Sequence, residues 1–170
     1  CGNTSVGSSD WHHPLDRMEL RGWYASGFYP GDSDHGYGPD ARHRNHDGLD
    51  LYAPIGTTIY ACIDGVITYK EDRGGYGHRI FLEGTYNGNK YFLMYCHLSE
   101  YITGEVKSGD PIGKTGQSGN ASGQAAKMNH LHFEVRKEKM TKPTFNLLTE
   151  IPKLGRDVIT NPDRNTQTGN

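Results

Sequence analysis

The stretch HLHFEVR, residues 130–136, alternates polar and apolar side chains without a break. This period of two predicts a half-buried β-strand, because successive side chains of a strand point to opposite faces. The three apolar residues would face the core, and the four polar residues would share the other face. His130 and His132 then lie about 6.5 to 7 Å apart. One imidazole could bind a metal ion while the other leans over the ion's open position.

Further β-rich runs lie upstream of this stretch. Residues 57–63 and 66–70 flank an Asp-Gly pair, which predicts a hairpin, and residues 79–83 and 90–97 flank an Asn-Gly turn. Residues 108–116 predict a turn followed by a short strand. Only residues 14–21 and 144–150 could be helical, and strands do not alternate with helices. We therefore expect a mainly β fold: a compact antiparallel sheet or sandwich with a groove and few short helices.

The composition excludes some classes of function. The 170 residues suit one domain, and 18 Lys and Arg against 20 Asp and Glu give a net charge of −2. With this near-neutral charge the chain has no strong positive electrostatic field that would attract nucleic acid or an anionic membrane. The 23 glycines and 34% apolar residues fit a turn-rich β protein. No apolar run is long enough to predict a membrane span.

The cysteines leave two questions open. Cys1 begins a small, polar stretch that resembles the mature end of a bacterial lipoprotein, and the alternative is a domain cut from a longer chain. With Cys62 and Cys96 there are three cysteines and no C-x-x-C pair, so no thiolate zinc site is expected. Cys62 and Cys96 could form a disulfide, but both lie in apolar stretches, which favours buried thiols.

Nine histidines are the unusual feature of the composition. His46 and Asp50 lie four residues apart, a span of about 13 Å in a straight strand, which is too far for both to reach one ion. Gly48 between them could turn the chain. His97 ends an apolar run and could equally be a buried core histidine. Each pattern is weak alone, and their joint occurrence in this order strengthens all of them.

The motifs together closely resemble the lysostaphin/LytM-type zinc metallopeptidases, which are bacterial peptidoglycan endopeptidases. The resemblance covers residues 14 to 137 and rests on five segments in order. These are HDGLDLYAPIGT (46–57), ACIDGVI (61–67), YCHLS (95–99), GDPIGKTGQSGN (109–120) and HLHFEVR (130–136). Residues 25–29 also resemble the family's lead-in strand. Lengthened loops from residue 29 and over residues 121–129 depart from the family and would affect substrate preference.

The resemblance implies a role for each residue of the site. One zinc ion per chain would be held by His46, Asp50 and His132. His97 and His130 would form the catalytic pair, and a zinc-activated water would hydrolyse the peptide bond without a covalent intermediate. The alternative is a noncatalytic relative that binds cell wall or activates a separate amidase. A toxin or phage enzyme with the same chemistry also remains open.

The resemblance also suggests the domain limits, the partner and the location. We expect a flexible tether over residues 1–13, the peptidase domain over 14–150 and a tail over 151–170. The partner would be a peptidoglycan peptide rather than nucleic acid, and the chain would be a monomer. It would act outside the cytoplasm, either anchored to the cell envelope through a lipid on Cys1 or secreted.

Some residues fall outside these roles. The histidines without a role in the resemblance are His12, His13, His35, His43 and His78. Either His35 or His43 could block the zinc from the loop that precedes the first ligand. Tyr37 and Tyr95 could each donate a hydrogen bond to the oxyanion, although ordinary packing is favoured for Tyr95.

Overall fold

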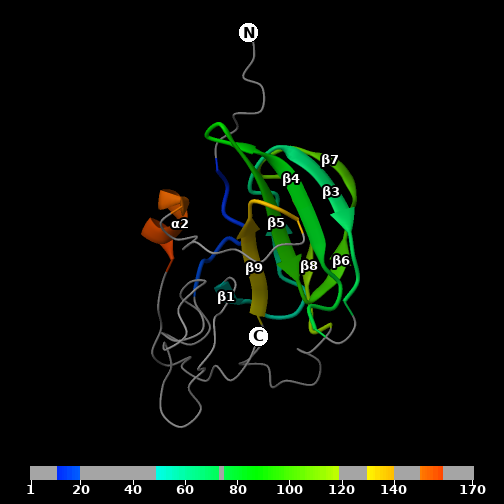
Figure 1. The fold of residues 1–170 in the computed structure, drawn as a ribbon. Helices are drawn as coiled ribbons and strands as arrows, with labels where there is room; N and C mark the ends of the chain where they lie inside the picture. Colours follow the sequence, from blue (N-terminus) through cyan, green and yellow to red (C-terminus); the bar gives the residue numbers. More distant parts are fainter. Residues whose placement is uncertain (1–10, 20–48, 73–74, 119–129, 140–149, 159–170) are drawn as a thin grey trace.

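The computed structural model describes residues 11–19, 49–72, 75–118, 130–139 and 150–158. These residues form nine strands and the short helix α2, and every strand pair is antiparallel (Figure 1). The expected mainly β fold with few helices is thus confirmed. Within the described part of the chain, no helix is long and apolar enough to cross a membrane.

The strands form two sheets. The six-stranded sheet has the order β1 (Leu49–Tyr52), β9 (His130–Arg136), β5 (Asn89–Cys96), β4 (Ile80–Tyr86), β3 (Gly65–Tyr69) and β7 (Gly104–Val106). The three-stranded sheet has the order β2 (Thr58–Tyr60), β8 (Pro111–Thr115) and β6 (Leu98–Tyr101). The chain passes from the first sheet to the second directly after β5, with only His97 between β5 and β6. This tight connection positions one of the candidate catalytic residues.

Strand β9 confirms the predicted alternation but not the predicted exposure. Leu131, Phe133 and Val135 join the main hydrophobic core, as expected. The polar side chains of the other face are buried as well, so the prediction of a half-buried strand is wrong. On this face the polar side chains lie beside a second buried cluster of Phe81, Met94 and Cys96, and Met94 and Cys96 pair directly with Glu134 and His132. An alternating pattern does not reveal what covers its polar face.

The two predicted hairpins have different outcomes. The β4–β5 hairpin is confirmed, and Asn87 (φ 54°) and Gly88 (φ 83°) supply the positive φ angles that a two-residue turn requires. The hairpin predicted at Asp64-Gly65 is wrong, because β2 pairs with β8 while β3 pairs with β4 and β7. The Asp64 carboxylate instead accepts a hydrogen bond from the Ser108 amide at 2.8 Å. It fastens the turn before β8 to this connection.

Both ends of the described chain contribute to the core. Trp11, in the segment predicted as a tether, is buried and contacts Phe133 edge to face. Residues 14–19 are not helical as proposed. Of the helix proposed over 144–150, residues 144–149 lie outside the described residues and Glu150 is helical. Helix α2 (Pro152–Asp157) lies in the predicted tail, and Ile151 and Leu154 are buried in the main cluster. Residues on both sides of 14–150 therefore contribute to the core.

The two described cysteines are thiols, as the sequence favoured. Cys62 and Cys96 are both buried and do not form a disulfide with each other. The Tyr95 hydroxyl donates to the Tyr60 carbonyl at 2.9 Å and accepts from the Cys62 amide at 3.2 Å. Burial raises the pKa of the Cys62 thiol, so this group stays protonated. Tyr95 is therefore a packing residue whose hydroxyl binds backbone groups inside the core.

Replacing Tyr95 with Phe should destabilise the fold. The Tyr95→Phe variant keeps the ring but leaves the Cys62 amide and the Tyr60 carbonyl without this hydroxyl, and a buried polar group left unsatisfied costs about 1 to 3 kcal/mol. Urea unfolding measures the loss. Tyr101→Phe is the control, because the Tyr101 side chain is exposed. Equal stability of the two variants would contradict the assigned role of Tyr95.

Candidate active site

Three histidines meet where β5 ends and β9 begins. His97 directly follows β5, while His130 and His132 lie at the first and third positions of β9. The His97 ring centroid lies 4.9 Å from that of His130 and 6.2 Å from that of His132. All three are buried. Pairing of Cys96 with His132 across β5 and β9 explains the convergence, because it brings the end of one strand beside the start of the other.

The backbone holds His97 in an unusual conformation. Its φ angle of 60° lies in the left-handed region, which costs a residue other than glycine about 1 to 3 kcal/mol. Two hydrogen bonds hold the chain there: the His97 amide donates to the Tyr76 carbonyl at 2.8 Å, and the Leu98 amide donates to the His78 carbonyl at 3.1 Å. The segment that contains Tyr76 and His78 therefore fixes the β5–β6 connection.

A hydrogen bond also determines which nitrogen of His97 carries a proton. Nδ1 lies 2.8 Å from the Ser118 carbonyl oxygen, which can only accept. Nδ1 is therefore the donor, and Nε2 of the neutral ring keeps its lone pair. The Nε2 atoms of His97 and His130 are both buried. The Ser118 side chain is fixed in turn, because its Oγ accepts from the His78 amide and donates to the Leu98 carbonyl, both at 2.9 Å.

His132 is oriented by a buried carboxylate. Its Nε2 lies 2.7 Å from Oε2 of Glu134, and Oε1 of Glu134 accepts from Nε of Arg136 at 2.6 Å. Burial alone would raise the pKa of Glu134, but the hydrogen bond and charge of His132, with the charge of Arg136, outweigh burial and lower it. Glu134 is thus a carboxylate at neutral pH. Because Nε2 of His132 is engaged, Nδ1 is the ring nitrogen that could bind a metal.

Two of the three predicted zinc ligands are not described as side chains. His46 lies outside the described residues, as does the Asp50 side chain, although the Asp50 backbone belongs to β1. The strand register pairs Asp50 directly with His132. Among the side chains that the structure describes, no group of three His, Cys, Asp or Glu residues could hold a metal ion. His132 is the predicted ligand whose side chain the structure describes. Its hydrogen bond from Nε2 to the Glu134 carboxylate is typical of a histidine that binds zinc.

The remaining predicted residues divide in a similar way. His13 binds Asp157 through Nε2 at 2.8 Å, and His78 binds the Tyr69 hydroxyl through Nδ1 at 2.8 Å. The His12 ring packs against the Tyr60 ring, with the centroids 5.1 Å apart. The others, His35, His43 and Tyr37, lie outside the described residues, as do the two lengthened loops.

The sequence analysis assigned no role to three residues that contact these histidines, Tyr76, Ser118 and Glu134. It also assigned none to Arg136, which contacts Glu134. The alternation of β9 places Glu134 and Arg136 on the face of His132, which is a signal that could have found them. Ser118 lies within a recognised motif, but its contact with His97 depends on the fold. Tyr76 lies far from every other site residue along the chain, and no local pattern indicates its position.

Comparison with known proteins identifies the class to which this fold and these histidines belong. Residues 44–143 match the model of peptidase family M23, which is more than half of the chain. The chain therefore belongs to peptidase family M23. This confirms the resemblance to lysostaphin/LytM-type peptidases.

Similar proteins are found among curated sequences. The chain is 39% identical to the DD-carboxypeptidase/endopeptidase Mpg of Neisseria meningitidis serogroup B over 95 residues. This alignment covers 55% of this chain and 20% of Mpg. Over 115 residues, it is 30% identical to the peptidoglycan DD-endopeptidase ShyA of Vibrio cholerae serotype O1, which covers 64% of this chain and 25% of ShyA. The chain thus spans a fifth to a quarter of the length of these relatives.

Solved structures share the fold. The catalytic domain of lysostaphin from Staphylococcus simulans aligns with a TM-score of 0.55 at 25% identity, covering 76% of this chain and 89% of that domain. A zinc-containing peptidase from Vibrio cholerae aligns with a TM-score of 0.56 at 26% identity, covering 80% of this chain and 41% of the other.

Removing the charge of Glu134 should destabilise the protein. Glu134→Gln leaves the buried Arg136 guanidinium without its carboxylate, and breaking a buried ion pair in this way costs about 3 to 5 kcal/mol. Because the folded-state pKa of Glu134 is lowered from its ordinary value of 4.5, its contribution is present above that pH and is lost as the pH falls further. Urea unfolding with a chelator present, between pH 7 and pH 3, measures the difference from wild type.

Glu83→Gln is the matched control. Glu83 is half-exposed and pairs with Lys90 at 2.7 Å, and an exposed pair contributes less than about 1 kcal/mol. If Glu134→Gln cost no more than Glu83→Gln at pH 7, the buried carboxylate would not be important for this site.

Proposed function

We propose that this chain is a zinc-dependent endopeptidase that hydrolyses peptide bonds in the stems or crosslinks of bacterial peptidoglycan. Membership of family M23 supports a peptidase, and the names of the relatives support this substrate. The observation that carries the proposal is the His97–His130 pair beside His132, whose Nε2 is held by Glu134. It supplies two imidazoles for proton transfer beside one that is oriented for a metal.

The donor set fits zinc. We assign the ion to His46, Asp50 and His132, since imidazole nitrogen and carboxylate oxygen are common zinc ligands and three of them leave a position open. His132 would bind through Nδ1, because its Nε2 donates to Glu134. A bound zinc ion supplies Lewis acidity, which lowers the pKa of a water and polarises a peptide carbonyl. The charge of Glu134 also makes the His132 ring a better ligand.

His97 and His130 handle the protons of the reaction. His97 keeps a proton on Nδ1 through the Ser118 carbonyl, so its Nε2 is the atom that accepts a proton from the attacking water. The same nitrogen can return the proton to the leaving amine. The His130 ring, 4.9 Å away, provides a second site that can donate to the developing oxyanion.

The names of the relatives, rather than the geometry of the site, support a choice of substrate bond. Mpg and ShyA are both named as enzymes that act on DD bonds, whereas lysostaphin is a fold relative at lower identity. We therefore favour crosslinks between D-alanine and a diamino acid over glycine bridges. Such an activity would be exerted outside the cytoplasm, where crosslinked peptidoglycan lies.

Digestion of defined crosslinked muropeptides tests this function. With one equivalent of zinc, the wild type should cut a single crosslink bond, as read by mass analysis. His97→Ala and His130→Ala should each lower kcat by about 10²- to 10⁴-fold, the usual contribution of acid–base catalysis. Asp50→Ala should lose zinc as well as activity, since it removes a ligand.

His12→Ala is the control for the loss of a histidine, because His12 is exposed and lies against Tyr60. It should cut at the wild-type rate. A wild type that binds sacculi but cuts no muropeptide, with or without zinc, would favour the noncatalytic relative instead.

A further inference from the structure

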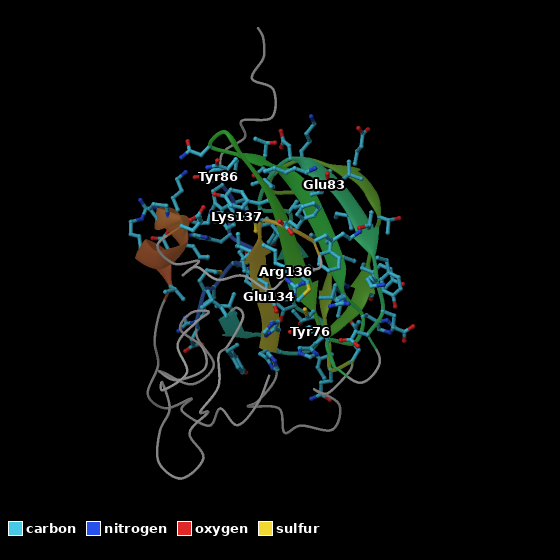
Figure 2. The ribbon with its side chains drawn as sticks, in the orientation of Figure 1. Tyr76, Glu83, Tyr86, Glu134, Arg136 and Lys137 are labelled. Atoms are coloured by element: carbon cyan, nitrogen blue, oxygen red, sulfur yellow. The ribbon has the colours of Figure 1, made fainter. Side chains whose placement is uncertain are left out.

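We propose that Tyr76 is a positioning residue that sets the His132 ring relative to His97. This inference rests on the proposed function, in which His132 binds the metal and His97 transfers the proton. Tyr76 touches both: its ring stacks on the His132 ring, and its carbonyl accepts the His97 amide. One residue therefore links the two parts of the site. Figure 2 shows Arg136 and Glu134 on β9 and Tyr76 below them, near the end where this strand begins.

The ring contact restrains His132 in a direction that Glu134 does not. The Tyr76 and His132 centroids lie 5.1 Å apart with an interplanar angle of 27°, which is an offset stack. The hydrogen bond from Nε2 to Glu134 lies in the plane of the imidazole and fixes where its edge points. The stacked ring limits rotation of the imidazole out of that plane. Together the two contacts fix the direction in which Nδ1 faces.

The Tyr76 side chain is itself supported. The guanidinium carbon of Arg79 lies 5.3 Å from the Tyr76 ring centroid, within the range of a cation–π contact. Arg79 is buried, and its Nε donates to the Lys70 carbonyl at 3.1 Å while its Nη1 lies 3.6 Å from Sδ of Met94. A fixed, buried cation therefore stabilises the ring that stacks on His132.

The backbone of Tyr76 is also fixed. Asp72 and Gly77 form an isolated antiparallel bridge, with amide-to-carbonyl distances of 2.8 Å and 2.7 Å. The Asp72 carboxylate accepts from the Tyr76 amide at 3.2 Å. A Cβ added at Gly75 would lie 2.7 Å from this carboxylate, so the turn closes tightly around it. The carbonyl that receives the His97 amide thus belongs to a well-anchored turn.

Zinc affinity and the state of the His132 ring test this role. Tyr76→Leu removes the stack but keeps the backbone carbonyl, and Tyr76→Phe keeps both. We expect Tyr76→Leu to weaken zinc binding about three- to tenfold, the scale of an aromatic contact, as measured by competition with a chromophoric chelator. Tyr76→Phe should bind zinc with the wild-type affinity. In the metal-free protein, the His132 ring protons should lose the ring-current shift of Tyr76 in the Leu variant alone.

Tyr86→Leu is the matched control. Tyr86 also makes one aromatic contact, with Trp11 at 5.6 Å, but at the far end of the sheet from Tyr76 (Figure 2). It should bind zinc as the wild type does even where its stability falls. Unchanged zinc affinity and unchanged His132 signals in Tyr76→Leu would overturn the role of Tyr76. A wild type that takes up no zinc would overturn the proposed function, and the positioning role with it.

Discussion

Strand β9 is hydrogen-bonded along both edges, to β1 and to β5, and the rest of the site depends on this double pairing. The register pairs His132 with Asp50 on one side and with Cys96 on the other, one residue before His97. A slip of one residue would exchange the two faces of the strand and send His132 into the hydrophobic core. The alternation that buries Leu131 and Phe133 is therefore also what aligns the histidines.

The groups on the buried polar face of β9 satisfy one another. The Glu134 carboxylate accepts hydrogen bonds from His132 and Arg136, and Nη1 of Arg136 donates to the Lys139 carbonyl at 2.9 Å. The guanidinium of Arg136 also approaches the Phe81 ring at 6.0 Å. A buried carboxylate is expensive to desolvate, and this one is held by two partners. The Glu134 carboxylate lies next to His132 and orients an imidazole that a metal could bind.

Much of the fold could be predicted, because alternation and Asn-Gly chemistry are local signals. They identify β9 and the β4–β5 hairpin. The prediction of an Asp-Gly hairpin is wrong because the pairing of β2 with β8 and of β3 with β7 outweighs the turn preference of two residues. The candidate histidines came from the order of motifs, whereas the residues that hold them depend on tertiary contacts. Tyr76 is the clearest case, since only the folded chain brings this residue to His132.

We propose that Glu134 holds Nε2 of His132 and leaves Nδ1 to a zinc ion shared with His46 and Asp50. Diffraction from crystals grown with one equivalent of zinc, with data on both sides of the zinc absorption edge, would locate the ion and its ligand atoms. We expect one anomalous peak per chain within about 2.0 to 2.2 Å of the three ligand atoms, with Nδ1 as the His132 donor. A peak on Nε2 of His132, or one away from β9, would contradict it.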